Sequence, residues 1–255
     1  MFNKRGQVTI FIIIALVIVV IGILIYLFWP KLNISSEFDA KNPELFIKSC
    51  VKDDLEDAVN LVSAQGGSIE PDFYYLYEDE RLEYLCYTPE YSTVCAIQQP
   101  FLRSHIEEEL TSYIEPYVSD CFDNLVEKYK DKGYSVQLEK GDVNTTLLPE
   151  RIQSVFQGYK LTAKKGNNAE IHQSFSVVLN NNLYQLANSI STNIIEWEAI
   201  FGDADNLGYM IINTQEGLKV YKLKQTDGTT VYKLEDKSGS KFQFASRSLV
   251  APPGY

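Results

Sequence analysis

The longest unbroken apolar stretch of the chain lies near its start, over residues 8–29. No charged residue interrupts it, and at the rise of an α-helix it would cover the roughly 30 Å hydrocarbon core of a bilayer. Lys4 and Arg5 precede the stretch, and positive residues favour the cytoplasmic side of a membrane. The pattern therefore predicts a cytoplasmic stub over residues 1–7, a transmembrane anchor over residues 8–29 that makes the lipid bilayer a partner, and an exported remainder.

Beyond an expected stalk over residues 30–42, three segments place their apolar residues at helical spacing. The first begins at Pro43, because proline is favoured at the first helical position and Asn42 before it is a favourable cap. The second opens near Ser104 with a capping-box pattern. The third covers residues 183–197, so three amphipathic helices are expected.

Alternating apolar and polar positions predict strands between and after these helices. Residues 73–77 and 81–87 are expected to form two strands joined by an acidic turn. More strands are expected between residues 134 and 180, although the pattern does not define their ends. An Asp-Gly and a Ser-Gly turn divide residues 218–245 into a predicted three-strand meander.

These elements predict an α+β fold in which one N-terminal transmembrane helix precedes an extracytoplasmic domain. That domain is expected to cover residues 43–247, with about three amphipathic helices packed on mostly antiparallel strands and a β-meander at its end. Residues 248–255 are expected to form a tail. The length permits one domain or two lobes, and no linker or repeat requires a division.

The net charge of the chain limits the kinds of molecule that we expect it to bind. The chain has a net charge of −11, and all 34 acidic residues follow the apolar stretch. The resulting negative potential repels nucleic acid and anionic lipid headgroups. We therefore expect no nucleic-acid partner, and we expect other surface proteins or glycans instead.

All four cysteines also follow the apolar stretch, and an oxidising compartment favours their pairing as disulfides. Cys50 and Cys121 lie on or beside the apolar stripes of two predicted helices, whereas Cys86 and Cys95 flank a short loop. This placement favours the pairs Cys50–Cys121 and Cys86–Cys95, while the two other connectivities stay open. A zinc site is the alternative, but the spacings lack the paired C-x-x-C arrangement of a zinc knuckle.

Six tyrosines gather beside the loop between Cys86 and Cys95. Aromatic side chains at this density can stack on sugars or form a protein-binding surface. Packing of alternate tyrosines beneath the sheet is the competing explanation. The candidate interaction patch consists of Tyr74, Tyr75, Tyr77, Tyr84, Tyr87 and Tyr91.

Other candidate chemistry is sparse. The two histidines are His105, expected to be exposed in the first turn of a helix, and His172, which has only Glu170 near it. No pattern indicates a catalytic residue, a metal ligand or a cofactor, so we do not expect an enzyme. Asn33 and Asn144 begin glycosylation sequons, which makes them candidate modification sites in an exported chain.

The N-terminus resembles a known signal. Residues 4–9, Lys-Arg-Gly-Gln-Val-Thr, continue directly into the apolar stretch, and this arrangement resembles the class III signal of archaeal type IV pilin-like proteins. The resemblance implies that a prepilin peptidase cleaves between Gly6 and Gln7 and leaves the apolar helix on the mature protein. Phe11 stands where the broader pilin family often has Glu, and Pro30 interrupts a helix that pilins tend to continue. The whole-chain pattern is also similar to that of uncharacterised archaeal surface proteins.

Together the observations predict a membrane-anchored cell-surface protein with a structural, adhesive or assembly role, of which a pilin-like filament subunit is one form. Its N-terminus is expected in the cytoplasm and its C-terminal domain outside. An extracytoplasmic ligand-binding module that works with a membrane partner is the alternative. An exported hydrolase that acts through carboxylates is a third hypothesis.

Overall fold

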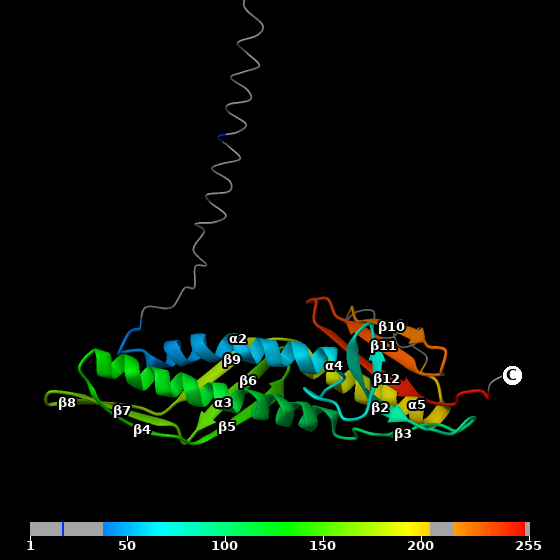
Figure 1. The fold of residues 1–255 in the computed structure, drawn as a ribbon, viewed down its shortest axis with the longest axis horizontal. Coiled ribbons are helices and arrows are strands. Elements are labelled where there is room, and N and C mark those ends of the chain that lie inside the picture. The colour runs from blue at the N-terminus through cyan, green and yellow to red at the C-terminus, as the bar shows by residue number, and fades with distance from the viewer. Residues whose placement is uncertain (1–16, 18–37, 205–216, 253–255) are drawn as a thin grey trace, which may run out of the picture. The chain divides into compact units, whose positions relative to one another are not determined.

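Figure 1 shows the computed structural model, which describes Val17, residues 38–204 and residues 217–252. The predicted cytoplasmic stub and, apart from Val17, the predicted anchor lie outside the described residues, as do Gly6, Gln7 and Asn33. No helix within the described part of the chain is long and apolar enough to cross a membrane. The chain divides into two units after Phe38, and the helices and strands from residue 43 onward lie in the unit that begins at Asp39.

The fold class predicted from the sequence is wrong. It expected a transmembrane helix, which the described residues do not contain, and about three amphipathic helices on mostly antiparallel strands, without a division of the strands into sheets. The twelve strands of the described residues instead form three separate sheets. Sequence periodicity identifies a segment as a strand, but the sheet that a strand joins depends on pairing with distant segments, which periodicity does not reveal.

Two long helices form the centre of the helical part. Helix α2 (Pro43–Ala64) and helix α3 (Leu102–Asp131) lie side by side in Figure 1 and bury their apolar stripes against each other. Pro116 lies inside α3, which continues through it as one helix. The Cys50–Cys121 disulfide joins the two helices.

The third predicted helix is irregular. It consists of α4 (Leu183–Ser189), the π-helical segment η1 (Ile190–Ile195) and α5 (Glu196–Phe201). It ends at Gly202, whose φ of 74° is in the left-handed region that glycine adopts without strain.

Two sheets of three antiparallel strands are built from the middle of the chain. One has the order β5-β6-β9 and packs against α2 and α3, and the other has the order β4-β7-β8. Phe122 of α3 fills the space above the first sheet, where its ring contacts Phe156, Tyr159 and Phe175. The strands are β4 (Ser135–Glu139), β5 (Asp142–Leu148), β6 (Arg151–Gln157), β7 (Lys160–Lys165), β8 (Asn168–His172) and β9 (Phe175–Asn180).

The largest sheet joins segments from both halves of the chain. Its order is β1-β2-β12-β11-β10, with β3 paired to β2. β10, β11 and β12 form an antiparallel meander, and β12 then pairs in parallel with β2, which places Ala245 opposite Tyr84. The strands are β1 (Tyr74–Tyr77), β2 (Glu80–Tyr87), β3 (Ala96–Ile97), β10 (Lys219–Lys224), β11 (Thr230–Glu235) and β12 (Lys241–Arg247).

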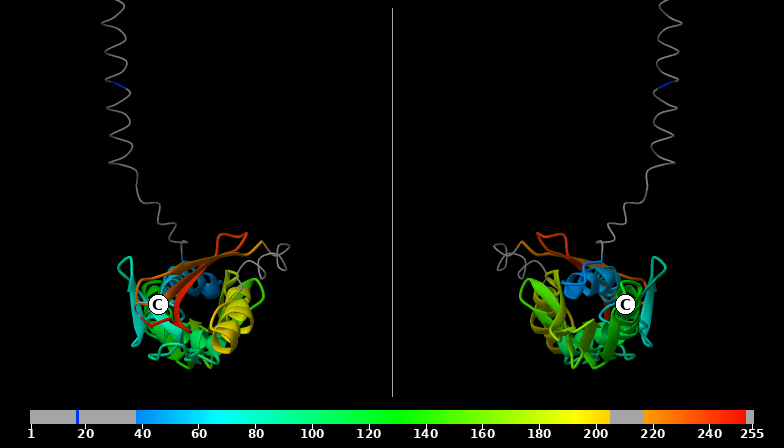
Figure 2. Two further views of the ribbon diagram at one scale, coloured as in Figure 1. Left: turned by 90° about the vertical axis from the view of Figure 1, so that its right-hand side faces the viewer. Right: turned by 90° about the vertical axis from the view of Figure 1, so that its left-hand side faces the viewer.

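In Figure 2 the C-terminal strands, orange to red, lie between the cyan β1–β2 hairpin on one side and the yellow α4–α5 helix on the other. This arrangement brings three distant segments together, the loop after β2, the turns of the meander and the end of α5. Both polar sites described next lie where these segments meet.

Candidate functional site

The structure separates the six tyrosines of the predicted interaction patch. Tyr84 is buried among Leu82, Val231 and Ala245, as the packing explanation expected. Tyr75, Tyr77 and Tyr87 lie partly buried against that cluster. Tyr74 and Tyr91 are exposed, at 39% and 48%. Alternation along β1 explains why Tyr74 is exposed while Tyr75 and Tyr77 are partly buried, because neighbouring side chains of a strand point to opposite faces.

Three of these tyrosines, Tyr84, Tyr87 and Tyr91, line one cavity of about 450 Å³, which we call the tyrosine cavity. The other three do not line it. The cavity also has a carboxylate and a guanidinium group in its wall, from Asp227 and Arg247. The remaining lining residues are Pro89, Thr226, Val250 and Ala251.

Arg247, at the end of β12, contacts several of the residues around the cavity. Its guanidinium carbon lies 6.0 Å from the ring centre of Tyr87 and 5.6 Å from that of Tyr91, within the range of a cation–π interaction. Its Nη1 donates to the carbonyl of Thr88, and its Nε donates to the carbonyl of Asp227 at 3.4 Å. A guanidinium group has five N–H donors, so these two bonds leave donors for a ligand.

Asp227 is held in place by Thr229. Its carboxylate accepts from the amide of Thr229 at 2.9 Å and from the hydroxyl of Thr229 at 3.0 Å. The Thr229 hydroxyl also lies 2.8 Å from the Tyr84 hydroxyl. Burial raises the pKa of Tyr84, and the nearby charge of Asp227 raises it further, so the phenol stays neutral. The lining of the cavity thus includes a fixed carboxylate acceptor and a fixed guanidinium donor.

The loop that carries Tyr91 is clamped on both sides. The Cys86–Cys95 disulfide closes its base. Ser92 donates its amide to the carbonyl of Val250 at 2.8 Å, and Leu249 donates to the carbonyl of Thr93 at 2.9 Å. The first residues of the predicted tail therefore pair with this loop, and Tyr91 is positioned before any ligand arrives.

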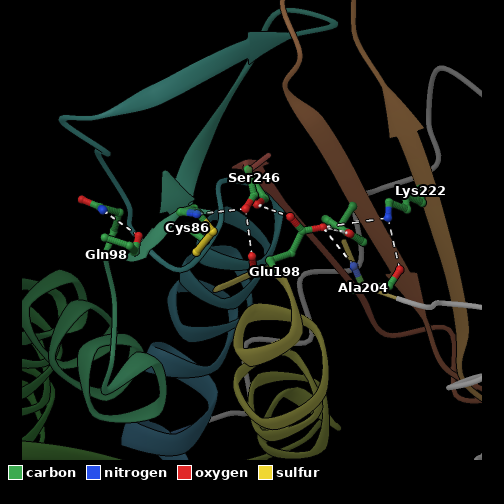
Figure 3. Close-up of a disulfide and its surroundings, with 10 residues drawn as sticks. Cys86, Gln98, Glu198, Ala204, Lys222 and Ser246 are labelled. Atoms are coloured by element: carbon green, nitrogen blue, oxygen red, sulfur yellow. Dashed lines mark hydrogen bonds and ion pairs between the residues drawn. A yellow bond between two sulfur atoms is a disulfide. The ribbon is translucent and has the colours of Figure 1, made fainter. Parts of the chain in front are cut away.

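A second polar site, which the sequence analysis missed, surrounds Glu198 of α5 and is shown in Figure 3. Glu198 is only 2% exposed. Its Oε1 accepts from the Tyr232 hydroxyl and from the amide of Ala204 at 3.3 Å, and its Oε2 accepts from the Ser246 hydroxyl at 3.1 Å. The Nζ of Lys222 lies 3.9 Å from Oε1.

A signal for this site was present in the sequence. Glu198 follows Ile190 and Ile194 at helical spacing, so the buried stripe of the third helix ends on a carboxylate. A carboxylate on an apolar stripe requires hydrogen-bond partners, because an unpaired buried charge is costly.

The remaining candidates are dispersed. The cysteines pair as Cys50–Cys121 and Cys86–Cys95, the pairing that the sequence favoured, and two disulfides fit an extracellular protein. Asn144 is exposed on β5.

His105 was expected to be exposed, but it is partly buried. Its side chain is 23% exposed, and its Nε2 lies 2.7 Å from the hydroxyl of Ser68. That hydroxyl donates to Glu83 at 2.6 Å. A catalytic triad needs the imidazole between the hydroxyl and the carboxylate, whereas here the hydroxyl of Ser68, itself buried, lies between the other two groups. This cluster joins α3 to β2 and has no nucleophile open to a substrate.

No group of three or more histidine, cysteine or carboxylate side chains in residues 38–204 and 217–252 is placed to hold a metal ion. Comparison of the chain with protein-family models, with curated proteins and with solved structures found no match.

Proposed function

We propose that this chain is a cell-surface protein with an adhesive role, and that it binds a saccharide in the tyrosine cavity. The observation that carries the proposal is the pairing of two aromatic rings, Tyr87 and Tyr91, with a fixed carboxylate and a fixed guanidinium group around one cavity. Its volume of about 450 Å³ lies in the range of small-ligand sites.

The chemistry of the cavity suits a sugar. The C–H faces of a sugar ring pack on aromatic faces, and its hydroxyl groups both donate and accept hydrogen bonds. Asp227 can accept from such hydroxyls, and the remaining N–H groups of Arg247 can donate to them. The clamped loop lowers the entropy lost on binding, because Tyr91 does not have to be ordered by the ligand.

The proposal includes attachment to the membrane. It rests on the uncharged sequence of residues 8–29 and on Lys4 and Arg5 before it, which favour a cytoplasmic N-terminus. The two disulfides support a domain outside the cytoplasm. An adhesive domain held at the cell surface in this way would meet glycans of its own envelope or of another cell.

A glycan array probed with the full-length chain tests the proposal. We expect binding to a restricted set of saccharides, and we expect Tyr91→Ala to weaken it about 5-fold, since stacking on one aromatic ring contributes on the order of 1 kcal/mol. Tyr117→Ala is the matched control, because Tyr117 is similarly exposed, at 39%, and lies on α3 away from the cavity. Absence of binding to any saccharide, or an equal loss in both variants, would contradict the proposal.

Filament assembly is a second candidate function. Trp197, Ile200 and Phe201 of α5 are exposed at 45%, 63% and 60%, and large apolar side chains on a surface are typical of protein interfaces. This observation favours assembly, and the signal-like residues before the apolar stretch agree with it. Mass analysis of the N-terminal peptide from native membranes tests it: a mature start at Gln7 would support a pilin-like subunit, and a start at Met1 or Phe2 would exclude prepilin-type cleavage.

A further inference from the structure

Lys222 of β10 reaches across to the loop that follows α5. Its side chain is 11% exposed, and its Nζ contacts the carboxylate of Asp203. The same nitrogen donates to the carbonyl of Ala204 at 3.1 Å and lies 3.9 Å from Oε1 of Glu198. One amine therefore has an aspartate in contact. The buried Glu198 lies beside the same amine (Figure 3).

Burial makes the charged form of the Lys222 amine less stable than it is in water. Burial lowers the pKa of Lys222, the charge of Lys224 lowers it further, and the carboxylate of Glu198 acts in the opposite direction. The pKa is lowered overall, which increases the fraction of amine with a free electron pair. A desolvated lysine amine is a competent nucleophile towards a carbonyl carbon.

Glu198 is held in place for proton transfer. Tyr232 and Ser246 donate to its two oxygens, so the carboxyl group keeps its orientation relative to Lys222. Burial raises the pKa of Tyr232, with the charge of Glu198 contributing in the same direction, so the phenol remains a donor. A fixed carboxyl group near a reacting nitrogen can accept its proton and return it to a leaving group.

We propose that Lys222 and Asp203 form an intramolecular amide bond, with Glu198 as the proton carrier. The inference does not depend on what the tyrosine cavity binds. Asp203 is 57% exposed, so the water that is released can leave, while Lys222 and Glu198 stay in the protein interior. Contact between the two reacting groups in the folded chain supplies the proximity that condensation in water otherwise lacks.

The reaction balances as a condensation. Proton transfer from the ammonium to the aspartate gives an amine and a carboxylic acid, and Nζ then attacks Cγ of Asp203. A C–N bond forms, Glu198 takes a proton from the nitrogen and delivers it to a hydroxyl group on Cγ, and the C–O bond breaks. One water molecule leaves, and the charges of Lys222 and Asp203 disappear together. No oxidant or other co-reactant is needed.

Mass spectrometry of the full-length protein tests the bond. We expect the oxidised chain to be lighter than its sequence mass, corrected for two disulfides, by one water molecule. After reduction, a tryptic digest should contain a branched peptide that joins Lys222 to Asp203, with no cleavage after Lys222. Mapping is required because the Asp227-Gly228 pair could also lose water by closing a cyclic imide, which would leave no branched peptide.

Three variants make the test specific. Asp203→Ala changes an exposed side chain and should abolish the branched peptide, as should Lys222→Arg, which keeps the positive charge. Glu198→Gln keeps the size of the side chain but removes the proton carrier, and we expect the branched peptide to fall at least ~10-fold, as for loss of a general acid–base group. A wild-type protein at full mass would overturn the bond. A Glu198→Gln protein that is branched to the wild-type level would overturn the role of Glu198.

Discussion

Two regions of the molecule differ in the polar groups that their interiors contain. In the helix region, which comprises α2, α3 and the sheet β5-β6-β9, the interior is filled by packed rings around Phe122. The buried hydroxyls there, on Thr145 and Ser154, bond to each other. In the sheet region, which comprises the largest sheet and α5, the buried Glu198 has hydrogen bonds from two side chains.

The difference shows how stability and recognition can be divided within one unit. Apolar packing is non-directional and stabilises a fold without fixing the position of any polar group. A buried hydrogen-bond network is costly to assemble, but it fixes the orientation of each member. Both candidate chemical sites, the tyrosine cavity and the cluster at Lys222, lie in the sheet region, whereas the aromatic cluster of the helix region is buried throughout. We therefore expect substitutions in the helix region to change stability and those in the sheet region to change chemistry as well.

The largest expected effect concerns the two disulfides. Replacing both Cys50 and Cys121 by Ser should lower the free energy of unfolding by about 4 kcal/mol, because the bond closes a sequence separation of 71 residues. The paired change at Cys86 and Cys95, with a separation of 9, should lower it by about 2.5 kcal/mol. Urea denaturation measures both. Equal losses of unfolding free energy for the two pairs would show that the length of the closed loop does not determine how much each disulfide stabilises the protein.

The next effect tests the aromatic interior of the helix region. Phe122→Ala removes a fully buried ring from contact with three others and should cost about 3 kcal/mol. Phe201→Ala is the matched control in the sheet region, because Phe201 is 60% exposed and should change stability by less than about 0.5 kcal/mol. Thermal unfolding, followed by circular dichroism, compares the stability of the two variants. A small loss of stability for Phe122→Ala would show that neighbouring side chains move into the space that the ring had filled.

A smaller effect is expected in the polar interior of the sheet region. Glu198→Gln preserves size but replaces one acceptor oxygen by a donor, so a buried donor loses its partner at a cost of about 2 kcal/mol. Glu196→Gln on the exposed face of the same helix should be almost neutral. Urea midpoints of the two variants provide the measurement, and equal midpoints would mean that the network contributes no stability.

The smallest effect is a pH dependence at the turn between β11 and β12. Burial raises the pKa of Asp236, but hydrogen bonds from Ser238, Asn182 and Ser240 outweigh it and hold the pKa below its ordinary value. Because the folded pKa is depressed, this stabilisation is present above the pKa of the unfolded chain, near 4, and is lost as pH falls through the folded value. Asp236→Asn should therefore destabilise the protein at pH 6, and this loss of stability should shrink as the pH falls below about 4. A loss that does not vary with pH would contradict this.

Single elements were easier to predict from the sequence than their partners. Pro43 marked the start of α2, and the Asp-Gly and Ser-Gly pairs lie in the turns of the meander. Local sequence patterns predict local conformation, because caps and turns depend on a few neighbouring residues. The parallel pairing of β2 with β12 has no local pattern, since the paired residues Tyr84 and Ala245 are far apart in the chain.

The candidate site was predictable in part for the same reason. The density of tyrosines pointed to the correct stretch of chain, but the sequence could not separate Tyr91, which lines the cavity, from Tyr74, which does not. Which tyrosines line the cavity depends on the positions of Asp227 and Arg247, and the fold of the meander places these two residues there. Glu198 was missed although its helical spacing was readable, because its partners come from β11, β12 and the loop after α5.

The parallel pair of β2 and β12 also determines the order of events when the protein is made. β2 is synthesised early, yet the neighbour that completes its hydrogen bonding is the last strand of the meander. Until residue 247 has emerged, β2 keeps an unpaired edge that could associate with other chains. An exported chain must therefore be protected during transfer, and its slow step should be this late closure, because contacts of large sequence separation form slowly.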